Sequence, residues 1–184
     1  MNTDLEKIFE NIRDKYGLKE PRLPPVNAWT PPFSGDIDIH IKCNGEWWYQ
    51  GAPMQRQEIA KLFSTILKRE GEEYFLVTPH EKWRIKVEMA PFMISSVERE
   101  GGGHSQVLLF TTTLGECFIL DKEHSLQMET FRDQQVPTVM VRNNLKGALS
   151  RAVYYEVTNW VVSHIDEGTE RLGVFSAGEF FPLD

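Results

Sequence analysis

The sequence has few of the residues on which metal sites, disulfide frameworks and membrane spans depend. Its 184 residues include two cysteines, Cys43 and Cys117, which lie too far apart to suggest a metal motif or a disulfide framework. The five histidines show no i, i+4 pairing, and a zinc site of Cys117 and His124 has no further support. No apolar run approaches the roughly 20 residues that span a bilayer. We therefore expect no metal and no cofactor.

Basic residues and targeting signals are also scarce. Neither end carries the charged region and apolar core of a signal peptide, so we expect a cytoplasmic protein with reduced thiols. Lysine and arginine number 20 against 27 acidic residues, which gives a net charge of -7. Non-specific binding to nucleic acid or to an anionic membrane needs a basic surface, so we expect neither. A small anion held by a few local arginines is compatible with this composition.

Recognised catalytic and nucleotide-binding motifs are missing as well. The sequence has no glycine-rich dinucleotide fingerprint, no P-loop and no G-x-S-x-G nucleophile turn. The run Gly101-Gly102-Gly103 follows none of these patterns and is interpreted as a flexible turn. The sequence therefore favours a protein that is not an enzyme.

What remains is an ordinary globular composition, with 41% hydrophobic and 26% charged residues. We divide the chain into an N-terminal helix and proline-rich arm (1–33), a first α+β half (34–90) and a second α+β half (91–184). A capping-box pattern begins the first helix at Thr3, and Gly17 ends it. Prolines favour extended chain in the arm, which we interpret as a strap that packs Trp29 and Phe33 onto the body. A ligand lid or a partner-binding segment is the alternative.

The first half begins with a hairpin. Isoleucines alternate with polar residues from Ile37 to Ile41, and Asn44-Gly45 is a strong turn signal before the return strand ending at Tyr49. A helix is expected over 55–70, with strands over 74–78 and 83–87. The expected buried stripe of that helix follows helical spacing. It comprises Ile59, Leu62, Phe63, Ile66 and Leu67.

The second half is read in the same way, with strands over 92–99, 107–113, 117–121 and 139–142. A long helix is expected over 147–165, followed by an extended tail. Both halves contain a Gly-Glu turn before a helix, at Gly45-Glu46 and at Gly115-Glu116. We therefore predict an α+β fold with a duplicated strand-hairpin and helix motif. A cleft between the halves is the expected ligand site.

Candidate binding residues lie mostly where predicted strands or helices begin or end. Glu81 and Lys82 occupy a loop between two strands, where binding groups concentrate, although a solvated connection is the alternative. Arg142 ends a strand and Arg151 lies on the next helix; their guanidinium groups suit phosphate or carboxylate, or salt bridges to the abundant acids. Arg56 begins a helix, where backbone N–H groups favour anions, so a basic residue is out of place.

The aromatic run of the hairpin adds two more candidates. Trp48 and Tyr49 could stack on a base, although a strand with one buried and one solvent-facing side explains them equally. With Arg56, Glu81, Lys82, Arg142 and Arg151, they complete the predicted ligand site.

Several short motifs occur together over nearly the whole chain. They include Pro24-Pro25-Val26, Gly35-Asp36-Ile37-Asp38, Leu76-Val77-Thr78-Pro79, Glu81-Lys82, Ala90-Pro91-Phe92 and Phe110-Thr111-Thr112. In combination they resemble the bacterial domain-of-unknown-function family 1285, from which His80 and Met89 depart. The resemblance implies a duplicated α+β fold, a C-terminal half loosely like a pleckstrin-homology barrel, and a nucleotide-like ligand between the halves. It also implies a role in signal transduction.

Our leading hypothesis is a non-catalytic, regulatory module that binds a small anionic ligand between the halves and reports it to a protein partner. One alternative is a small hydrolase-type enzyme with Glu81 as general base. Another is a protein-interaction scaffold that uses the proline arm and the aromatic hairpin as its contact face.

Overall fold

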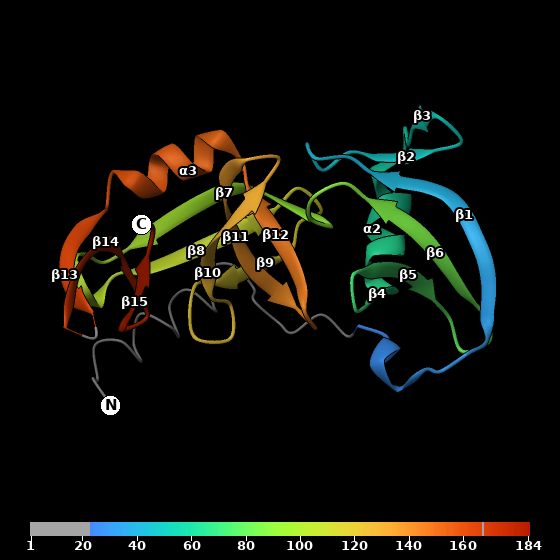
Figure 1. Cartoon of the computed structure of the whole chain (residues 1–184), viewed down its shortest axis with the longest axis horizontal. Coiled ribbons are helices and arrows are strands. Elements are labelled where there is room, and N and C mark those ends of the chain that lie inside the picture. The colour runs from blue at the N-terminus through green and yellow to red at the C-terminus, as the bar shows by residue number, and fades with distance from the viewer. Residues whose placement is uncertain (1–22, 167) are drawn as a thin grey trace.

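The computed structural model describes residues 23–166 and 168–184, and the helix expected to begin at Thr3 lies outside these ranges. Figure 1 shows two twisted sheets side by side along the long axis, with a small third sheet at one end. The first sheet has six strands. They are β1 (Phe33–Ile41), β2 (Trp47–Tyr49), β3 (Ala52–Pro53), β4 (Leu67–Glu70), β5 (Glu73–Val77) and β6 (Lys82–Val87).

The second sheet also has six strands. They are β7 (Phe92–Glu100), β8 (Val107–Thr112), β9 (Cys117–Ile119), β10 (Leu126–Phe131), β11 (Gln134–Arg142) and β12 (Leu145–Leu149). A three-stranded sheet follows. It holds β13 (Val162–Asp166), β14 (Thr169–Ser176) and β15 (Glu179–Pro182). Strands dominate, and the class is α+β as predicted.

The two large sheets share one topology. Their strand orders are β3-β2-β1-β6-β5-β4 and β9-β8-β7-β12-β11-β10. In each half the first and last strands form the central pair, and that pair is parallel whereas the others are antiparallel. The predicted duplication is therefore present in the strands.

The helices and Gly-Glu turns do not follow this duplication. Helix α2 (Gln57–Thr65) joins the third and fourth strands of its half, whereas α3 (Arg151–Thr158) follows the sixth. Gly45-Glu46 connects the first and second strands of the first half, but Gly115-Glu116 connects the second and third of the other. The correspondence we drew between these turns was wrong, because the Gly-Glu dipeptide recurs at a connection that is not equivalent in the repeated topology.

Helix α2 is shorter than predicted and packs through a different face. Residues 67–70 form β4 and turn through Gly71, whose φ of 60° suits glycine, into β5. Ala60 and Ser64 are buried, whereas Ile59 is 40% and Leu62 63% exposed. Phe63 and Ile66 pack against the core and Leu67 is buried, as the stripe predicted, so it failed only at Ile59 and Leu62. It was drawn over 16 residues that the chain divides between a helix and a strand.

The last helix was also predicted too long. Ser150 caps α3 by accepting a hydrogen bond from the backbone N–H of Val153, so the residues before it belong to β12. Asn159 ends the helix, and β13 begins at Val162. Val153 and Val157 of α3 are buried.

The proline arm packs against the first sheet. Its 3-10 turn η1 (Val26–Ala28) contacts β4, and Lys68 Nζ donates to the backbone carbonyl of Trp29 at 3.1 Å. Val26 is buried, whereas Phe33 is exposed and meets Phe75 edge to face. The arm is a strap, as predicted, but it is anchored by Val26 instead of Phe33.

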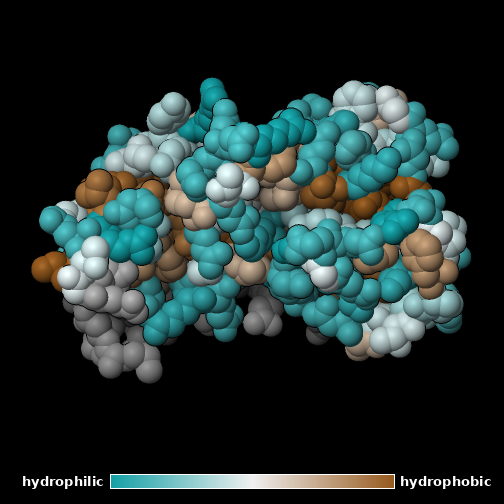
Figure 2. Space-filling model, in the orientation of Figure 1, coloured by the Kyte–Doolittle hydropathy of each residue, from teal (hydrophilic) through white to brown (hydrophobic). Residues whose placement is uncertain are grey.

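One apolar core runs through both halves. Buried residues of the first sheet, such as Ile39 and Leu67, belong to the same cluster as Phe92 and Phe110 of the second. At the far end of the second half, Figure 2 shows apolar surface where α3 and β13 lie; exposed side chains there include Tyr155, Val162 and Ile165. In the described part of the chain, no helix is long and apolar enough to cross a membrane.

Candidate functional site

The sequence-predicted site residues of the first half lie at opposite ends of its sheet. Lys82 pairs with Phe33 at the start of β1, whereas Trp48 pairs with His40 near the end of that strand. Seven residues separate these two positions on β1, about 20 Å at roughly 3.3 Å per residue. The loop pair and the aromatic pair therefore cannot hold one small ligand together.

At the end of the sheet that carries the β5–β6 loop, the Lys82 side chain contacts other residues of this chain. Its Nζ donates to Glu70 Oε2 at 2.8 Å and lies 4.8 Å from the centre of the Phe75 ring. Glu81 is exposed and accepts from Trp83 Nε1 at 3.3 Å. Lys82 thus neutralises a carboxylate of this chain and covers an aromatic side chain.

At the other end, Trp48 is part of a local network and Tyr49 is exposed at 45%. Trp48 Nε1 donates to Glu46 Oε2 at 3.2 Å, and Lys42 Nζ lies 5.4 Å from the ring centre. No hydrogen bond or ion pair joins the side chains of Arg56 and Arg151 to any residue in the described ranges. Both arginines are exposed at the start of their helices.

Arg142 is the one predicted site residue that lies in the seam between the halves. Its Nε and Nη2 bind the carboxylate of Glu116 at 2.9 and 3.0 Å, and Nη2 also donates to the Ser64 carbonyl of α2 at 2.8 Å. Its guanidinium carbon lies 5.1 Å from the centre of the Phe92 ring. The Arg142 and Glu116 side chains are 11% and 19% exposed. This arginine therefore links the two halves through a partly buried ion pair.

The Glu88 carboxylate binds the β1–β2 turn, close in sequence to Trp48. Glu88 accepts from the Cys43 backbone N–H at 3.0 Å and from Lys42 Nζ at 3.2 Å. The Cys43 N–H and the Lys42 ammonium lower the pKa of Glu88. Because both favour the ionised form in the folded state, this carboxylate holds the β1–β2 turn against β6 only while it is charged.

The depressed pKa of Glu88 predicts a pH dependence of stability. A lowered folded-state pKa adds stability above the unfolded value, and that stability is lost as pH falls through the folded value. As pH falls from about 5 to about 3, the free energy of unfolding should therefore decrease less in Glu88→Gln than in the wild type. Urea unfolding at several pH values in this range measures the decrease, and Glu58→Gln, at an exposed position, is the control. Parallel curves for wild type and Glu88→Gln would contradict the assignment.

No cluster of metal-ligating side chains occurs in residues 23–166 and 168–184. His124, which we considered beside Cys117 for zinc, has its Nδ1 3.0 Å from Asp121 Oδ1 and stacks on Phe118. Burial raises the pKa of Asp121, but hydrogen bonds from the His124 side chain and backbone outweigh it and hold the pKa below its usual value. This contact is a local Asx turn of the chain after β9.

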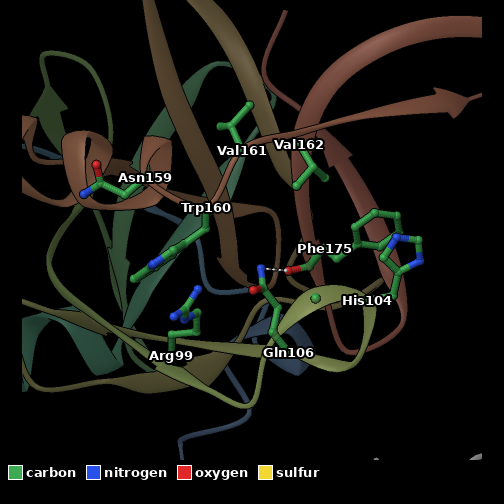
Figure 3. A pocket seen from close by; sticks show the side chains of 9 residues that line it. Arg99, His104, Gln106, Asn159, Trp160, Val161, Val162 and Phe175 are labelled. Atoms are coloured by element: carbon green, nitrogen blue, oxygen red, sulfur yellow. Dashed lines mark hydrogen bonds between the residues drawn. The ribbon is translucent and has the colours of Figure 1, made fainter.

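A pocket lies away from the seam, in the second half. It has a volume of about 210 Å³ and is enclosed by the end of α3, the β7–β8 connection with η2 (Gly103–Ser105), and β13 and β14. Figure 3 shows Trp160 on one side, Val162 and Phe175 on the other, and Gln106 between them.

Arg99 brings a cationic group to this pocket. Its guanidinium carbon lies 5.2 Å from the centre of the Trp160 indole, a cation–π contact. Arg99 is exposed, and none of the carboxylates in the described ranges pairs with it. In a chain with an excess of acids, a lone guanidinium held by a tryptophan beside a cavity is an anion-binding arrangement.

The opposite wall and the floor are aromatic and polar. His104 stacks on Phe175 with ring centres 4.0 Å apart, and His164 meets the same ring edge on at 5.0 Å. Gln106 is buried, and its Nε2 donates to the Phe175 carbonyl at 2.8 Å. Figure 3 places its side-chain oxygen toward Arg99 and Trp160, and no hydrogen-bond donor of the described residues reaches that oxygen.

Sequence analysis did not select these residues. Trp160 falls within the helix expected over 147–165, and the glycine run before His104 is interpreted there as a flexible turn. A usable signal was present in Asn159 and the β-branched residues after Trp160, which together mark a helix end followed by a strand. No sequence pattern, however, connects Arg99 to a tryptophan 61 positions away.

The fold is that of a duplicated α+β protein. Its two large sheets have the same strand order and meet at the partly buried Arg142, and a third sheet with a pocket follows. Two family models match it: "Domain of unknown function (DUF1285), N-terminal domain" over residues 24–90, and "Protein of unknown function (DUF1285), C-terminal domain" over 91–183. The chain belongs to the DUF1285 family.

Two solved structures are similar. A DUF1285 family protein from Silicibacter pomeroyi DSS-3 is 38% identical, with a TM-score of 0.79 and 92% of each chain covered. Another, from Shewanella baltica OS155, is 33% identical with a TM-score of 0.52 and covers 66% of this chain and 90% of its own. None of the curated proteins matches. The resemblance drawn from the sequence motifs is thus confirmed at the level of the family.

Proposed function

We propose that the protein is a non-catalytic binding module that takes up a small anionic ligand and reports it to a partner in bacterial cytoplasmic signal transduction. The observation that carries this proposal is the Arg99 guanidinium, which lines the 210 Å³ pocket, lies against Trp160 and pairs with no carboxylate of the described residues. An anion there would gain a charge-assisted hydrogen bond without displacing a carboxylate of the chain.

The seam between the halves offers less to a ligand. Arg142 already binds a carboxylate and a carbonyl through Nε and Nη2, and only its buried Nη1 is without a hydrogen-bond partner among the described residues. Binding by Arg56, Lys82, Arg151 and the aromatic pair stays a prediction, as does the likeness of the second half to a pleckstrin-homology barrel. The pocket supports anion binding better because its cation has no competing partner among the described residues.

The test is ligand-induced thermal stabilisation of the whole chain. Acetate, benzoate, inorganic phosphate and adenosine monophosphate cover the anion classes. A ligand at about 100 times its Kd should add roughly 2.7 kcal/mol, a shift of several degrees. We expect the shift to vanish in Arg99→Met and to persist in Lys86→Met, which removes an exposed charge from the first sheet. Equal shifts in both variants, or none in the wild type, would overturn the proposal.

A further inference from the structure

The pocket limits its ligand in size and charge. Its volume of about 210 Å³ lies below the roughly 300–1,000 Å³ typical of pockets for drug-sized ligands. Among its lining residues, Arg99 is the single permanent cation, and no lysine is present. Glu98 and Glu100 flank Arg99 on β7 and so point to the opposite face of the strand. A single guanidinium suits one carboxylate better than a multiply charged phosphate chain.

The pocket also has flat walls. The Trp160 indole lies on one side, and Val162 and Phe175 lie on the other (Figure 3). The Phe175 ring is itself stacked on His104, with ring centres 4.0 Å apart. Aromatic rings pack well against such faces in stacked or edge-on geometry. A planar ring therefore packs flat against the Trp160 indole, whereas a puckered aliphatic ring of the same size cannot.

The buried side-chain amide of Gln106 favours a ligand that carries a hydrogen-bond donor. Its position is fixed because Nε2 donates to the Phe175 carbonyl, which leaves Oε1 as an acceptor facing the pocket. Gln106 is 4% exposed, so a ligand that covers this oxygen without donating to it would leave a buried acceptor unpaired. A ligand N–H at this position removes that penalty.

From these three features we infer that the pocket binds a flat aromatic carboxylate of one or two fused rings that carries a ring N–H. The carboxylate pairs with Arg99, the ring lies between Trp160 and Phe175, and the N–H donates to Gln106 Oε1. The inference rests on the proposed function, since it names the ligand class for that same pocket.

Titration calorimetry on the whole chain with three matched acids tests the inference. Indole-2-carboxylate has the ring and the N–H, benzofuran-2-carboxylate has the ring alone, and cyclohexanecarboxylate has the charge alone. We expect indole-2-carboxylate to bind roughly tenfold tighter than benzofuran-2-carboxylate, the cost of one unpaired acceptor, and cyclohexanecarboxylate to bind weakest. Arg99→Met should abolish binding of all three, and Lys86→Met should leave it unchanged.

The outcomes separate the inference from the proposed function. Equal affinity for the three acids, lost in Arg99→Met, would overturn the aromatic N–H class and leave the anion-binding module standing. Binding of inorganic phosphate in preference to every carboxylate, again dependent on Arg99, would do the same. Binding of the indole acid that survives Arg99→Met would place the ligand elsewhere and overturn both.

Discussion

Arg142→Met is expected to lower the free energy of unfolding by about 3 kcal/mol, the lower end of the range for breaking a buried ion pair, because both side chains are partly buried. The substitution leaves the Glu116 carboxylate, 19% exposed, without its bidentate partner, and it leaves the Ser64 carbonyl near the end of α2 without that donor. Urea unfolding followed by circular dichroism measures the change.

The matched control for Arg142→Met is the double variant Arg142→Met/Glu116→Leu. Replacing both members of a buried pair by apolar residues is often neutral or stabilising, so the double variant should recover most of the loss. A single variant that loses less than about 1 kcal/mol would show that the pair behaves as a surface salt bridge. A double variant as unstable as the single one would show that Arg142 acts through its other contacts instead.

Phe110→Ala is expected to cost about 3–5 kcal/mol, the usual range for truncating a buried phenylalanine. Phe110 lies in β8 with no exposed surface and pairs with Phe118 across the strands. Because one apolar cluster joins both sheets, the loss should also lower hydrogen-exchange protection of β1 and β5 in the first half. Mass spectrometry of exchanged peptides measures this effect.

Phe33→Ala provides the control for Phe110→Ala, since Phe33 is 54% exposed and should cost less than about 1 kcal/mol. If Phe110→Ala destabilises the second half while peptides of β1 and β5 keep wild-type protection, the halves unfold independently. That result would contradict a single cooperative core.

Local patterns in the sequence were sufficient to predict much of the strand structure. Alternating isoleucines and the Asn44-Gly45 turn predicted the first hairpin, because period and turn chemistry act within a few residues. The hairpins at Arg132-Asp133 and Asn143-Asn144 were missed as hairpins. At each of these turns both residues adopt positive φ. Arg-Asp and Asn-Asn can adopt this conformation but also occur in many others, so these dipeptides alone do not predict a hairpin.

Helix lengths and the candidate site could not be obtained in the same way. Ile66 and Leu67 fit a helical stripe as well as the start of a strand, and the pairing of Leu67 with Leu76 decides between them. The partners of Arg142 are similarly non-local, since Ser64 lies 78 positions earlier. Charged side chains near strand ends were visible in the sequence, but which acids neutralise them depends on how the two sheets meet.

The parallel pair at the centre of each large sheet has a consequence for how the chain acquires its structure. Because β1 pairs with β6 and β7 with β12, each sheet can close only when its last strand is available. That strand begins roughly fifty residues after the first one, and pairing between residues so far apart in sequence raises the contact order and slows folding. During synthesis the first sheet can close once Val87 has left the ribosome, before the second has been made. The Arg142 contact with Ser64 would then form late, as the second sheet docks onto a half that is already folded.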